Sequence, residues 1–220
     1  MNIEKARLNM IEQQIRPWNV LDQDVLDSLI VVRREAFVPA AYKTLAFIDT
    51  EIPLPNGESM FFPKLEARIV QEVAIKKHEH VLEVGAGSGY MAALLAHRAR
   101  HVTTVEIDPV LKALAQKNLA DYGISNVEVA LGNGAQGWAN AGAEAPYDVI
   151  VISGSLPVLP DTFLQQIKVG GRIFAIIGES PVMSAQLITR VSDVAYNTVK
   201  LFETDVKPLR EALTPSHFVF

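Results

Sequence analysis

The stretch Val81-Leu82-Glu83-Val84-Gly85-Ala86-Gly87-Ser88-Gly89-Tyr90 decides the fold. A short apolar strand runs into alternating glycines, and a helix-forming segment follows. Glycine adopts a positive φ without strain and has no Cβ to keep a ligand from the backbone. In open α/β sheets such a turn lies at the carboxyl end of the first strand, where ligands bind. A strand-to-helix turn with glycines is also common without a ligand, so this turn alone is weak support for a binding site.

A carboxylate at the end of the next strand strengthens the ligand interpretation. The segment Val105-Glu106-Ile107-Asp108 follows the glycine turn by about 20 residues, where nucleotide-binding folds place an acid for ribose hydroxyls. The alternative is a surface acid at a strand end. Because the glycine turn and the acid occur together at this spacing, we expect Glu106, with Ile107 beside it, to line a nucleoside site.

The spacing of the glycines and a preceding acid indicate which nucleoside. A dinucleotide fingerprint reads G-x-G-x-x-G, whereas here Gly85, Gly87 and Gly89 alternate and Tyr90 stands in the place of the third glycine. Glu83 comes two residues before the turn. An anionic pyrophosphate gains nothing from a nearby carboxylate, whereas a ligand with an ammonium and a sulfonium does. The pattern therefore favours S-adenosylmethionine over NAD.

The rest of the chain alternates predicted strands and helices, which implies βαβ units and a mainly parallel sheet. Two helices, the first over 6–15 and the second from Asp22 to before Pro39, precede a loop over 48–63. Further helices are predicted over 65–77, 91–98, 109–122 and 161–167, and strands over 81–84, 102–107, 127–131, 148–153 and 172–177. The alternating stretches 186–191 and 198–204 can supply the last strands, antiparallel at one edge.

Composition limits the classes of function. The chain has 220 residues, a formal net charge of -5 and no cysteine. An acidic protein is not built to grip a nucleic-acid backbone, and without cysteine there are no disulfides, thiolate catalysis or Cys-type zinc sites. We find neither an apolar signal core at the N-terminus nor an apolar run of membrane-spanning length. We therefore expect a cytoplasmic protein without nucleic-acid or membrane partners, as a monomer or weak homo-oligomer.

Several segments resemble the protein-L-isoaspartate O-methyltransferase family, within the class I methyltransferases. The glycine turn, "VTTVEID" over 102–108 and "LQQIKVGGRIFAIIG" over 164–178 are shared by many methyltransferases. More specific to this family are Val32-Arg33-Arg34-Glu35-Ala36-Phe37-Val38-Pro39, Ile52-Pro53-Leu54-Pro55-Asn56-Gly57, Pro157-Val158-Leu159-Pro160 and Asp205-Val206-Lys207-Pro208-Leu209. The resemblance covers roughly residues 6–209.

The resemblance implies a fold, an activity and a set of site residues. The fold is α/β: a Rossmann-like, doubly wound, mainly parallel seven-stranded sheet. We expect one domain over 1–220, with a helical extension and substrate and cofactor loop over 1–63 and the binding core over 64–220. The activity is methylation of the α-carboxylate of L-isoaspartyl residues in damaged proteins, with S-adenosylhomocysteine as product. The implied cofactor contacts are Ser59, Met60, Glu83, Gly85, Ala86, Gly87, Gly89, Glu106, Ile107, Asn133 and Gly134, and no metal is implied.

Two positions depart from the family pattern. The family has Thr-Ile-Ser-Gln-Pro before the third helix, where this chain has Ser59-Met60-Phe61-Phe62-Pro63. Phe61 therefore replaces the active-site serine, and Ser59 is left to supply a catalytic hydroxyl. Phe61 and Phe62 can either cover the cofactor or pack in the core. Asn133 stands where the family usually has an aspartate for the adenine amino group, and its carbonyl can still accept a hydrogen bond.

Three functional hypotheses therefore stand. The first is isoaspartyl methylation, the second is a divergent methyltransferase with another acceptor, and the third is a non-catalytic S-adenosylmethionine-binding protein. Other motifs have plainer interpretations. His97 and His101 have metal-ligand spacing but span a helix end, so solvated histidines are favoured. Lys64, Glu66 and Arg68 are expected in a solvated first turn, although Lys64 or Arg68 can instead meet a substrate carboxylate. Ser153 either touches substrate or caps a turn.

Overall fold

A twisted sheet at the centre of the molecule carries the site. The computed structural model describes residues 2–138 and 147–214, and these residues form a seven-stranded sheet of order β5-β4-β3-β6-β7-β8-β9. The strands are β3 (His80–Val84), β4 (His101–Glu106), β5 (Val127–Leu131), β6 (Tyr147–Leu156), β7 (Ile167–Glu179), β8 (Val182–Arg190) and β9 (Tyr196–Thr204). In this order, β5, β4, β3, β6 and β7 pair in parallel with their neighbours, and β8 runs antiparallel to both β7 and β9. The expected fold class, including the antiparallel edge, is confirmed.

The strand order reverses at β3, and this reversal places the glycine turn. The chain leaves β3 for β4 and β5 on one side and later returns to β6 on the other side. Connections that diverge from one strand leave a crevice at its carboxyl end, where open α/β sheets bind ligands. The segment after Val84 runs through this crevice into α4 (Tyr90–Arg98). The fold therefore places the glycine turn at the carboxyl end of β3, where open α/β sheets bind ligands.

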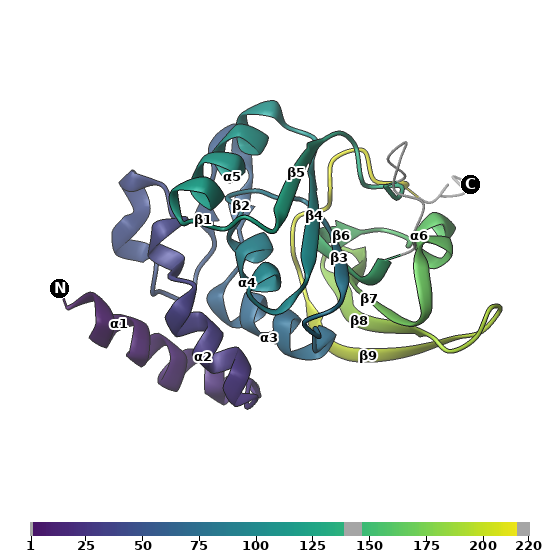
Figure 1. Cartoon of the computed structure of the whole chain (residues 1–220), viewed down its shortest axis with the longest axis horizontal. Helices are drawn as coiled ribbons and strands as arrows, with labels where there is room; N and C mark the ends of the chain where they lie inside the picture. The colour runs from purple at the N-terminus through teal and green to yellow at the C-terminus, as the bar shows by residue number, and fades with distance from the viewer. Residues whose placement is uncertain (1, 139–146, 215–220) are drawn as a thin grey trace.

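Helices cover both faces of the sheet, and apolar strand residues separate into two cores. On one face α3 (Pro63–Val73), α4 and α5 (Pro109–Asp121) pack with the N-terminal helices in one apolar cluster. On the other face α6 (Asp161–Gln166) packs through Phe163 in a second cluster. Figure 1 shows α3 and α4 between the N-terminal helices and the sheet, with the β8–β9 hairpin at the opposite end of the molecule.

The N-terminal segment builds one wall of the site. Helix α1 (Ile3–Met10) continues through a π-helical turn, and Asp22 caps α2 (Gln23–Val31) by accepting from the backbone N–H groups of residues 24 and 25. Short 3₁₀ turns follow, and strands β1 (Ile52–Pro53) and β2 (Ser59–Met60) form a small antiparallel pair in the predicted loop. This pair fixes the loop that carries Ser59. The division into one domain with an extension up to residue 63 stays a prediction.

The structure corrects several predicted boundaries. Helix α3 ends at Val73 rather than at 77, because Ala74 takes a left-handed φ of 43° and stops the helix. The strand expected over 172–177 begins at Ile167, which pairs with Tyr147 across a register shift. Gly170 and Gly171 follow the predicted helix over 161–167 and favour a helix end there, but both lie within β7 in the structure. Local glycine content predicted a stop, whereas pairing with β6 extends the strand.

Candidate active site

Two adjoining cavities open above the carboxyl ends of β3, β4 and β6, among the residues that the structure describes. The larger one encloses about 730 Å³ out to its mouth, within the range of small-molecule sites. Its walls come from the ends of β3, β4 and β6, the loop after β5, the start of α5, the loop before α3 and the tail after β9. They include Glu51, Glu58, Val84, Val105, Glu106, Ile107, Leu111, Asn133, Gly134, Lys207, Leu209 and Arg210.

The inner cavity is smaller and more acidic. It encloses about 330 Å³ and is lined by Leu54, Met60, Glu66, Glu83, Ala86, Ser88, Tyr90 and Met91. Ser59, Phe61, Gly85, Gly87 and Ser153 line both cavities. A ligand in the larger cavity can therefore extend past the glycine turn into the inner one.

The glycine turn and Glu106 form one unit. Gly87 has a φ of 52°, a conformation that only glycine adopts readily. Its N–H donates to Glu106 Oε2 at 2.9 Å, and the N–H of Asp108 donates to Glu106 Oε1 at 3.0 Å. These two bonds hold the carboxylate at the wall of the larger cavity. Each oxygen keeps a lone pair for a ligand hydroxyl, as the ribose hypothesis requires.

Asn133 and Gly134, which follow β5, form another part of the wall of the larger cavity. A Cβ on Gly134 would lie 2.8 Å from Val84 Cγ1, so no side chain fits at this position. The Asn133 side chain accepts from the N–H of Ala135 at 2.9 Å and donates to Glu211 at 2.7 Å. These bonds fix the amide, and its carbonyl oxygen keeps a second lone pair. This wall therefore offers a fixed hydrogen-bond acceptor, which fits the base of a nucleoside.

Glu83 is fully buried in the inner cavity wall. Thr104 Oγ1 donates to its Oε2 at 2.6 Å, and Ser153 Oγ donates to its Oε1 at 2.9 Å. Burial raises the pKa of Glu83 to about 8, although both hydroxyls lower it. Both of these hydrogen-bond partners are hydroxyls rather than cations. A buried carboxyl of this kind gains from a positive ligand group, which is the fit expected for an ammonium.

The loop before α3 places Ser59 and Phe61 over the junction of the two cavities. Phe61 is half-buried and lines both of them, and it also packs against the larger apolar cluster. Phe61 therefore packs against the core, and covering of the cofactor by this side chain stays a prediction. Ser59 Oγ donates to Glu51 Oε2 at 3.1 Å. Ser59 thus lines the junction, with its hydroxyl hydrogen-bonded to the Glu51 carboxylate.

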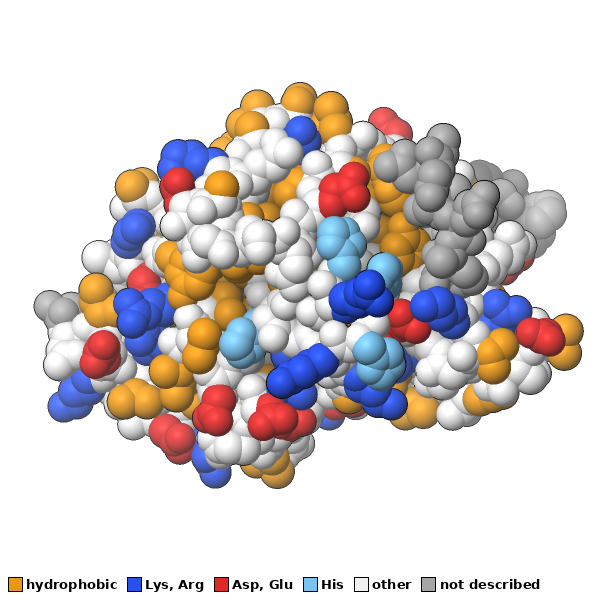
Figure 2. All heavy atoms as spheres, in the orientation of Figure 1, with side chains coloured by type: hydrophobic (Ala, Val, Ile, Leu, Met, Phe, Trp, Pro, Cys, Tyr) orange, Lys and Arg blue, Asp and Glu red, His pale blue; other side chains and the backbone are white. Residues whose placement is uncertain are grey.

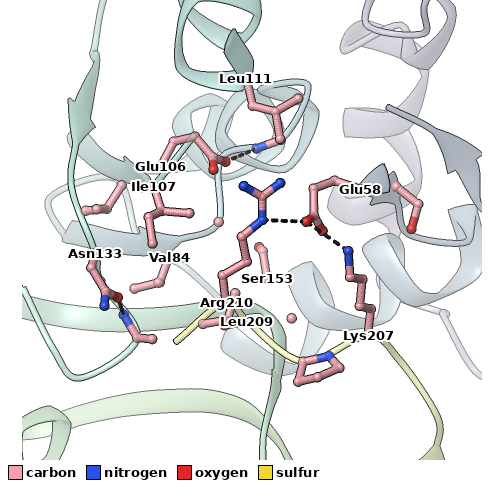
Figure 3. A pocket seen from close by; sticks show the side chains of 18 of the residues that line it. Glu58, Val84, Glu106, Ile107, Leu111, Asn133, Ser153, Lys207, Leu209 and Arg210 are labelled. Carbon is pink, nitrogen blue, oxygen red and sulfur yellow. Dashed lines mark hydrogen bonds and ion pairs between the residues drawn. The ribbon is translucent and has the colours of Figure 1, made fainter. Parts of the chain in front are cut away.

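A network of charged groups joins the loop to the C-terminal tail across the mouth of the larger cavity. Figure 3 shows Arg210 and Lys207 both pointing to Glu58. The distances are 2.8 Å from Arg210 Nε and 2.9 Å from Lys207 Nζ. Arg210 also reaches Asp108 at 3.1 Å, and Asn56 donates to Asp108 at 2.7 Å, which lowers the pKa of Asp108. We call these five side chains the mouth network.

The structure brings together most of the predicted site residues. Ten of the eleven line one or both cavities. Gly89 is the exception among them, since a Cβ there would meet Ala115 O at 3.2 Å and Leu119 Cγ at 3.3 Å. The role that its geometry supports is close packing of the turn on α5. Ser153, left open between substrate and turn, faces both cavities and holds Glu83.

Sequence reasoning missed the mouth network, Glu51 and Glu66. Asn56, Asp108 and Lys207 lie in segments that carry the family resemblance, but no pattern relates them to one another, because only the fold brings these distant segments together. Glu66, expected in a solvated turn, is only 3% exposed. Lys64 and Arg68 pair with Asp49 and Glu72 and line neither cavity.

Two histidines lie at the amino ends of parallel strands, at the opposite end of these strands from the site. His80 and His101 begin the parallel strands β3 and β4, with ring centroids 6.0 Å apart. Figure 2 shows histidines beside Lys and Arg side chains on one face. Burial and the neighbouring His101 lower the pKa of His80. Within the described ranges there is no group of three or more side chains suited to a metal, and no helix there is long and apolar enough to cross a membrane.

Sheet order, glycine turn and strand-end acid together define a Rossmann-like protein of the class I methyltransferase type. Comparison with known proteins narrows this class. The sequence profile of protein-L-isoaspartate(D-aspartate) O-methyltransferase matches residues 5–209. Similar relatives include protein-L-isoaspartate O-methyltransferases of Rhodopseudomonas palustris, 37% identical over 96% of this chain and 90% of the relative, and of Methanoculleus marisnigri, 37% identical over 79% and 78%. The chain belongs to the protein-L-isoaspartate(D-aspartate) O-methyltransferase family.

Solved structures agree with this fold. A Plasmodium falciparum structure, described as a protein-L-isoaspartate O-methyltransferase in complex with S-adenosyl-L-homocysteine, aligns with a TM-score of 0.80 at 19% identity, over 96% of this chain and 99% of that one. Another protein-L-isoaspartate O-methyltransferase aligns with a TM-score of 0.76 at 25% identity, over 94% of this chain and 65% of that one.

Proposed function

We propose that this protein transfers a methyl group from S-adenosylmethionine to the α-carboxylate of L-isoaspartyl residues in damaged proteins. Family membership supports the reaction. The observation that supports this cofactor is that Glu106 lines the larger cavity while the buried Glu83 lines the inner one. A nucleoside with a cationic tail matches both carboxylates at once.

Cofactor binding divides between the two cavities. S-adenosylmethionine supplies an electrophilic methyl group on a sulfonium. Glu106 accepts from the ribose hydroxyls, Asn133 and Gly134 flank the base, and Glu83 faces the α-ammonium. Gly85, Ala86 and Gly87 leave room for the methionine part of the cofactor beside the backbone. Met60 and Ile107 form apolar walls. With the cofactor held in this way, its methyl group would lie where the two cavities join, near Ser59 and Phe61, which line both.

The acceptor needs alignment rather than activation. An isoaspartyl α-carboxylate is already ionised at neutral pH, so the reaction requires no general base. The protein has to hold one carboxylate oxygen in line with the methyl group and to exclude water. Phe61 excludes water at the junction, and Ser59 is the hydroxyl placed to donate to the acceptor. That second role requires Ser59 to turn from Glu51.

Methyl incorporation into a peptide tests the proposal. The purified protein is incubated with labelled S-adenosylmethionine and an isoaspartyl peptide, beside the same peptide with a normal aspartate. We expect label in the isoaspartyl peptide only, and loss of label in Glu106→Ala because cofactor binding weakens by about 1–3 kcal/mol. Binding of S-adenosylhomocysteine without label in either peptide would remove the acceptor assignment.

A second candidate is methylation of a different acceptor. Phe61 in place of the family serine and the bond from Ser59 to Glu51 favour it. A panel of carboxylate, amine and hydroxyl acceptors separates the two candidates, and cofactor binding without any turnover would indicate a non-catalytic protein. Cytoplasmic location, the monomeric or weakly oligomeric state and the absence of nucleic-acid partners stay predictions.

A further inference from the structure

A buried ion pair connects the inner cavity with the N-terminal segment. Glu66, in the first turn of α3, lines the cavity and is only 3% exposed. Its Oε2 accepts from Arg34 Nε at 2.8 Å, and Arg34 is only 1% exposed. The sequence showed no reason to place either residue near the cofactor. Their contacts join residues that are 32 positions apart.

Arg34 also holds the backbone of the loop before α3 that carries Ser59 and Phe61, which we call the acceptor loop. Its Nη2 donates to the carbonyl of Phe61 at 2.6 Å, and its Nη1 donates to the carbonyl of Ala46 at 3.2 Å. Its guanidinium carbon lies 5.7 Å from the centroid of the Tyr90 ring, which also lines the inner cavity. One side chain therefore joins a cavity carboxylate to the residue that covers both cavities.

Such a pair is costly as a purely structural element. Removing two charges from water costs free energy that their attraction does not always return, and apolar pairs of similar volume often stabilise a protein as well or better. Burial raises the pKa of Glu66 to about 7, even with Arg34 opposing the shift. The groups facing it are Arg34, Glu83 and Tyr90. The Glu66 charge is therefore sensitive to any cation that enters the cavity.

We propose that Arg34 and Glu66 form a positioning pair that fixes the acceptor loop when a cationic group fills the inner cavity. The inference rests on the proposed cofactor binding. A positive charge beside Glu66 favours its ionised form. The ionised carboxylate accepts more strongly from Arg34, and Arg34 in turn holds the Phe61 carbonyl. Ser59, two residues earlier, is then fixed at the junction as well.

Amide hydrogen exchange of the loop tests this coupling without any acceptor. Exchange over residues 58–62 is measured with and without saturating S-adenosylhomocysteine, in wild type and in Glu66→Gln. We expect the ligand to slow exchange by about tenfold in wild type, as for one charge-assisted hydrogen bond, and to slow it far less in Glu66→Gln. Glu35→Gln is the matched control, because Glu35 pairs with Arg7 in the same segment and lines neither cavity. This control should respond as wild type does.

Kinetics and a paired replacement distinguish positioning from folding. With an isoaspartyl peptide, Glu66→Gln should raise KM about tenfold while kcat falls less, because the loop is placed less often. The double variant Arg34→Met with Glu66→Met should fold and bind S-adenosylhomocysteine, yet lose ligand-induced protection of the loop. Equal protection in wild type and both variants overturns the pair but leaves the proposed function intact. Failure of wild type to bind S-adenosylhomocysteine overturns both.

Discussion

Glu83 is the residue whose chemistry depends most directly on the ligand. Burial raises its pKa to about 8, so it is largely protonated at neutral pH before an ammonium reaches it. A facing ammonium favours the ionised form and releases the proton. We expect the affinity for S-adenosylhomocysteine to rise as the pH increases from about 6 to about 8. Calorimetry in two buffers of different ionisation enthalpy measures the released proton.

The substitution Glu83→Gln provides the control for this linkage. The amide keeps the size and an acceptor but cannot ionise, so binding should weaken by about 1–3 kcal/mol and lose its pH dependence over that range. A wild-type protein that binds equally at both ends of the range, without proton release, would place the ammonium elsewhere.

Gly87 is a glycine of the turn that lines both cavities and donates its N–H to Glu106. Gly87→Val puts a branched side chain between the two cavities at a φ of 52° and brings its Cβ to 3.3 Å from Leu54 Cδ1. We expect S-adenosylhomocysteine binding to be lost and stability to fall by about 1–2 kcal/mol from the left-handed backbone. Gly123→Val is a matched control, because Gly123 has a φ of 78° and nothing within 4 Å of a Cβ. Calorimetry should show binding in the control only.

Substitutions at Phe61 and Ser59 test how the acceptor is held. Phe61→Ser restores the family hydroxyl at the junction of the cavities and should raise isoaspartyl methylation. Ser59→Ala should lower it, because the remaining hydroxyl is lost. A missing donor costs up to about 10²–10³ in rate where charge develops, and here the nucleophile loses charge, so we expect the lower end or less. Initial rates of methyl incorporation decide the matter, and unchanged rates in both variants would remove these side chains from the acceptor site.

At the scale of elements, the sequence predicts the strands better than the segments between them. Val81 to Val84 and Val102 to Glu106 are apolar runs with clear ends, and both became strands with nearly the expected limits. The start of β7 could not be predicted, because pairing of Ile167 with Tyr147 is a tertiary contact. The β1–β2 pair was also missed, since two-residue strands carry no periodicity.

The mouth network joins two elements that the sequence keeps apart. Arg210 and Glu58 are 152 positions apart, so no local pattern relates them. Arg210→Ala should change the free energy of unfolding by less than about 1 kcal/mol, because the pair is partly exposed. It should nevertheless speed dissociation of S-adenosylhomocysteine several-fold by loosening the mouth.

Stopped-flow dissociation, repeated at low and high salt, measures this effect. Lys117→Ala is the control, since Lys117 forms an exposed pair with Asp121 on α5 away from both cavities. Equal dissociation rates for wild type and Arg210→Ala would show that the network does not retain the ligand.

At the scale of the whole molecule, the buried acids link stability to pH. Glu83 has a folded pKa of about 8 against an ordinary value of 4.5. Between these values the folded state binds more protons than the unfolded state, so its contribution to stability is present at low pH and is lost as the pH rises towards 8. His80 acts in the opposite direction, because its pKa is lowered.

Urea unfolding of wild type and Glu83→Gln isolates this contribution, since His80 is common to both proteins. We expect the free energy of unfolding of wild type, relative to the variant, to fall from pH 6 to pH 8. Parallel pH profiles would mean that Glu83 is not buried as described.

The candidate site could be predicted where one segment carries the chemistry. The glycine turn, Glu83 and Glu106 lie next to strands that the sequence reveals, and the sheet brings them to one edge. Glu66, Arg34 and the mouth network depend on how the N-terminal segment and the tail pack over that edge. Their positions follow from tertiary structure, so a single sequence could not place them.

Repair of an isoaspartyl peptide tests the central claim most directly. Esterification activates the carbonyl carbon of the α-carboxyl group, so the amide nitrogen of the following residue attacks it, methanol leaves and a succinimide forms. Water then opens the succinimide partly to normal aspartate. The measurement is chromatographic separation of the isoaspartyl and aspartyl forms after prolonged incubation with the protein and S-adenosylmethionine. We predict steady conversion of the isoaspartyl into the aspartyl form, abolished in Gly87→Val. An isoaspartyl peptide that stays unchanged while wild-type protein binds S-adenosylhomocysteine would contradict the account.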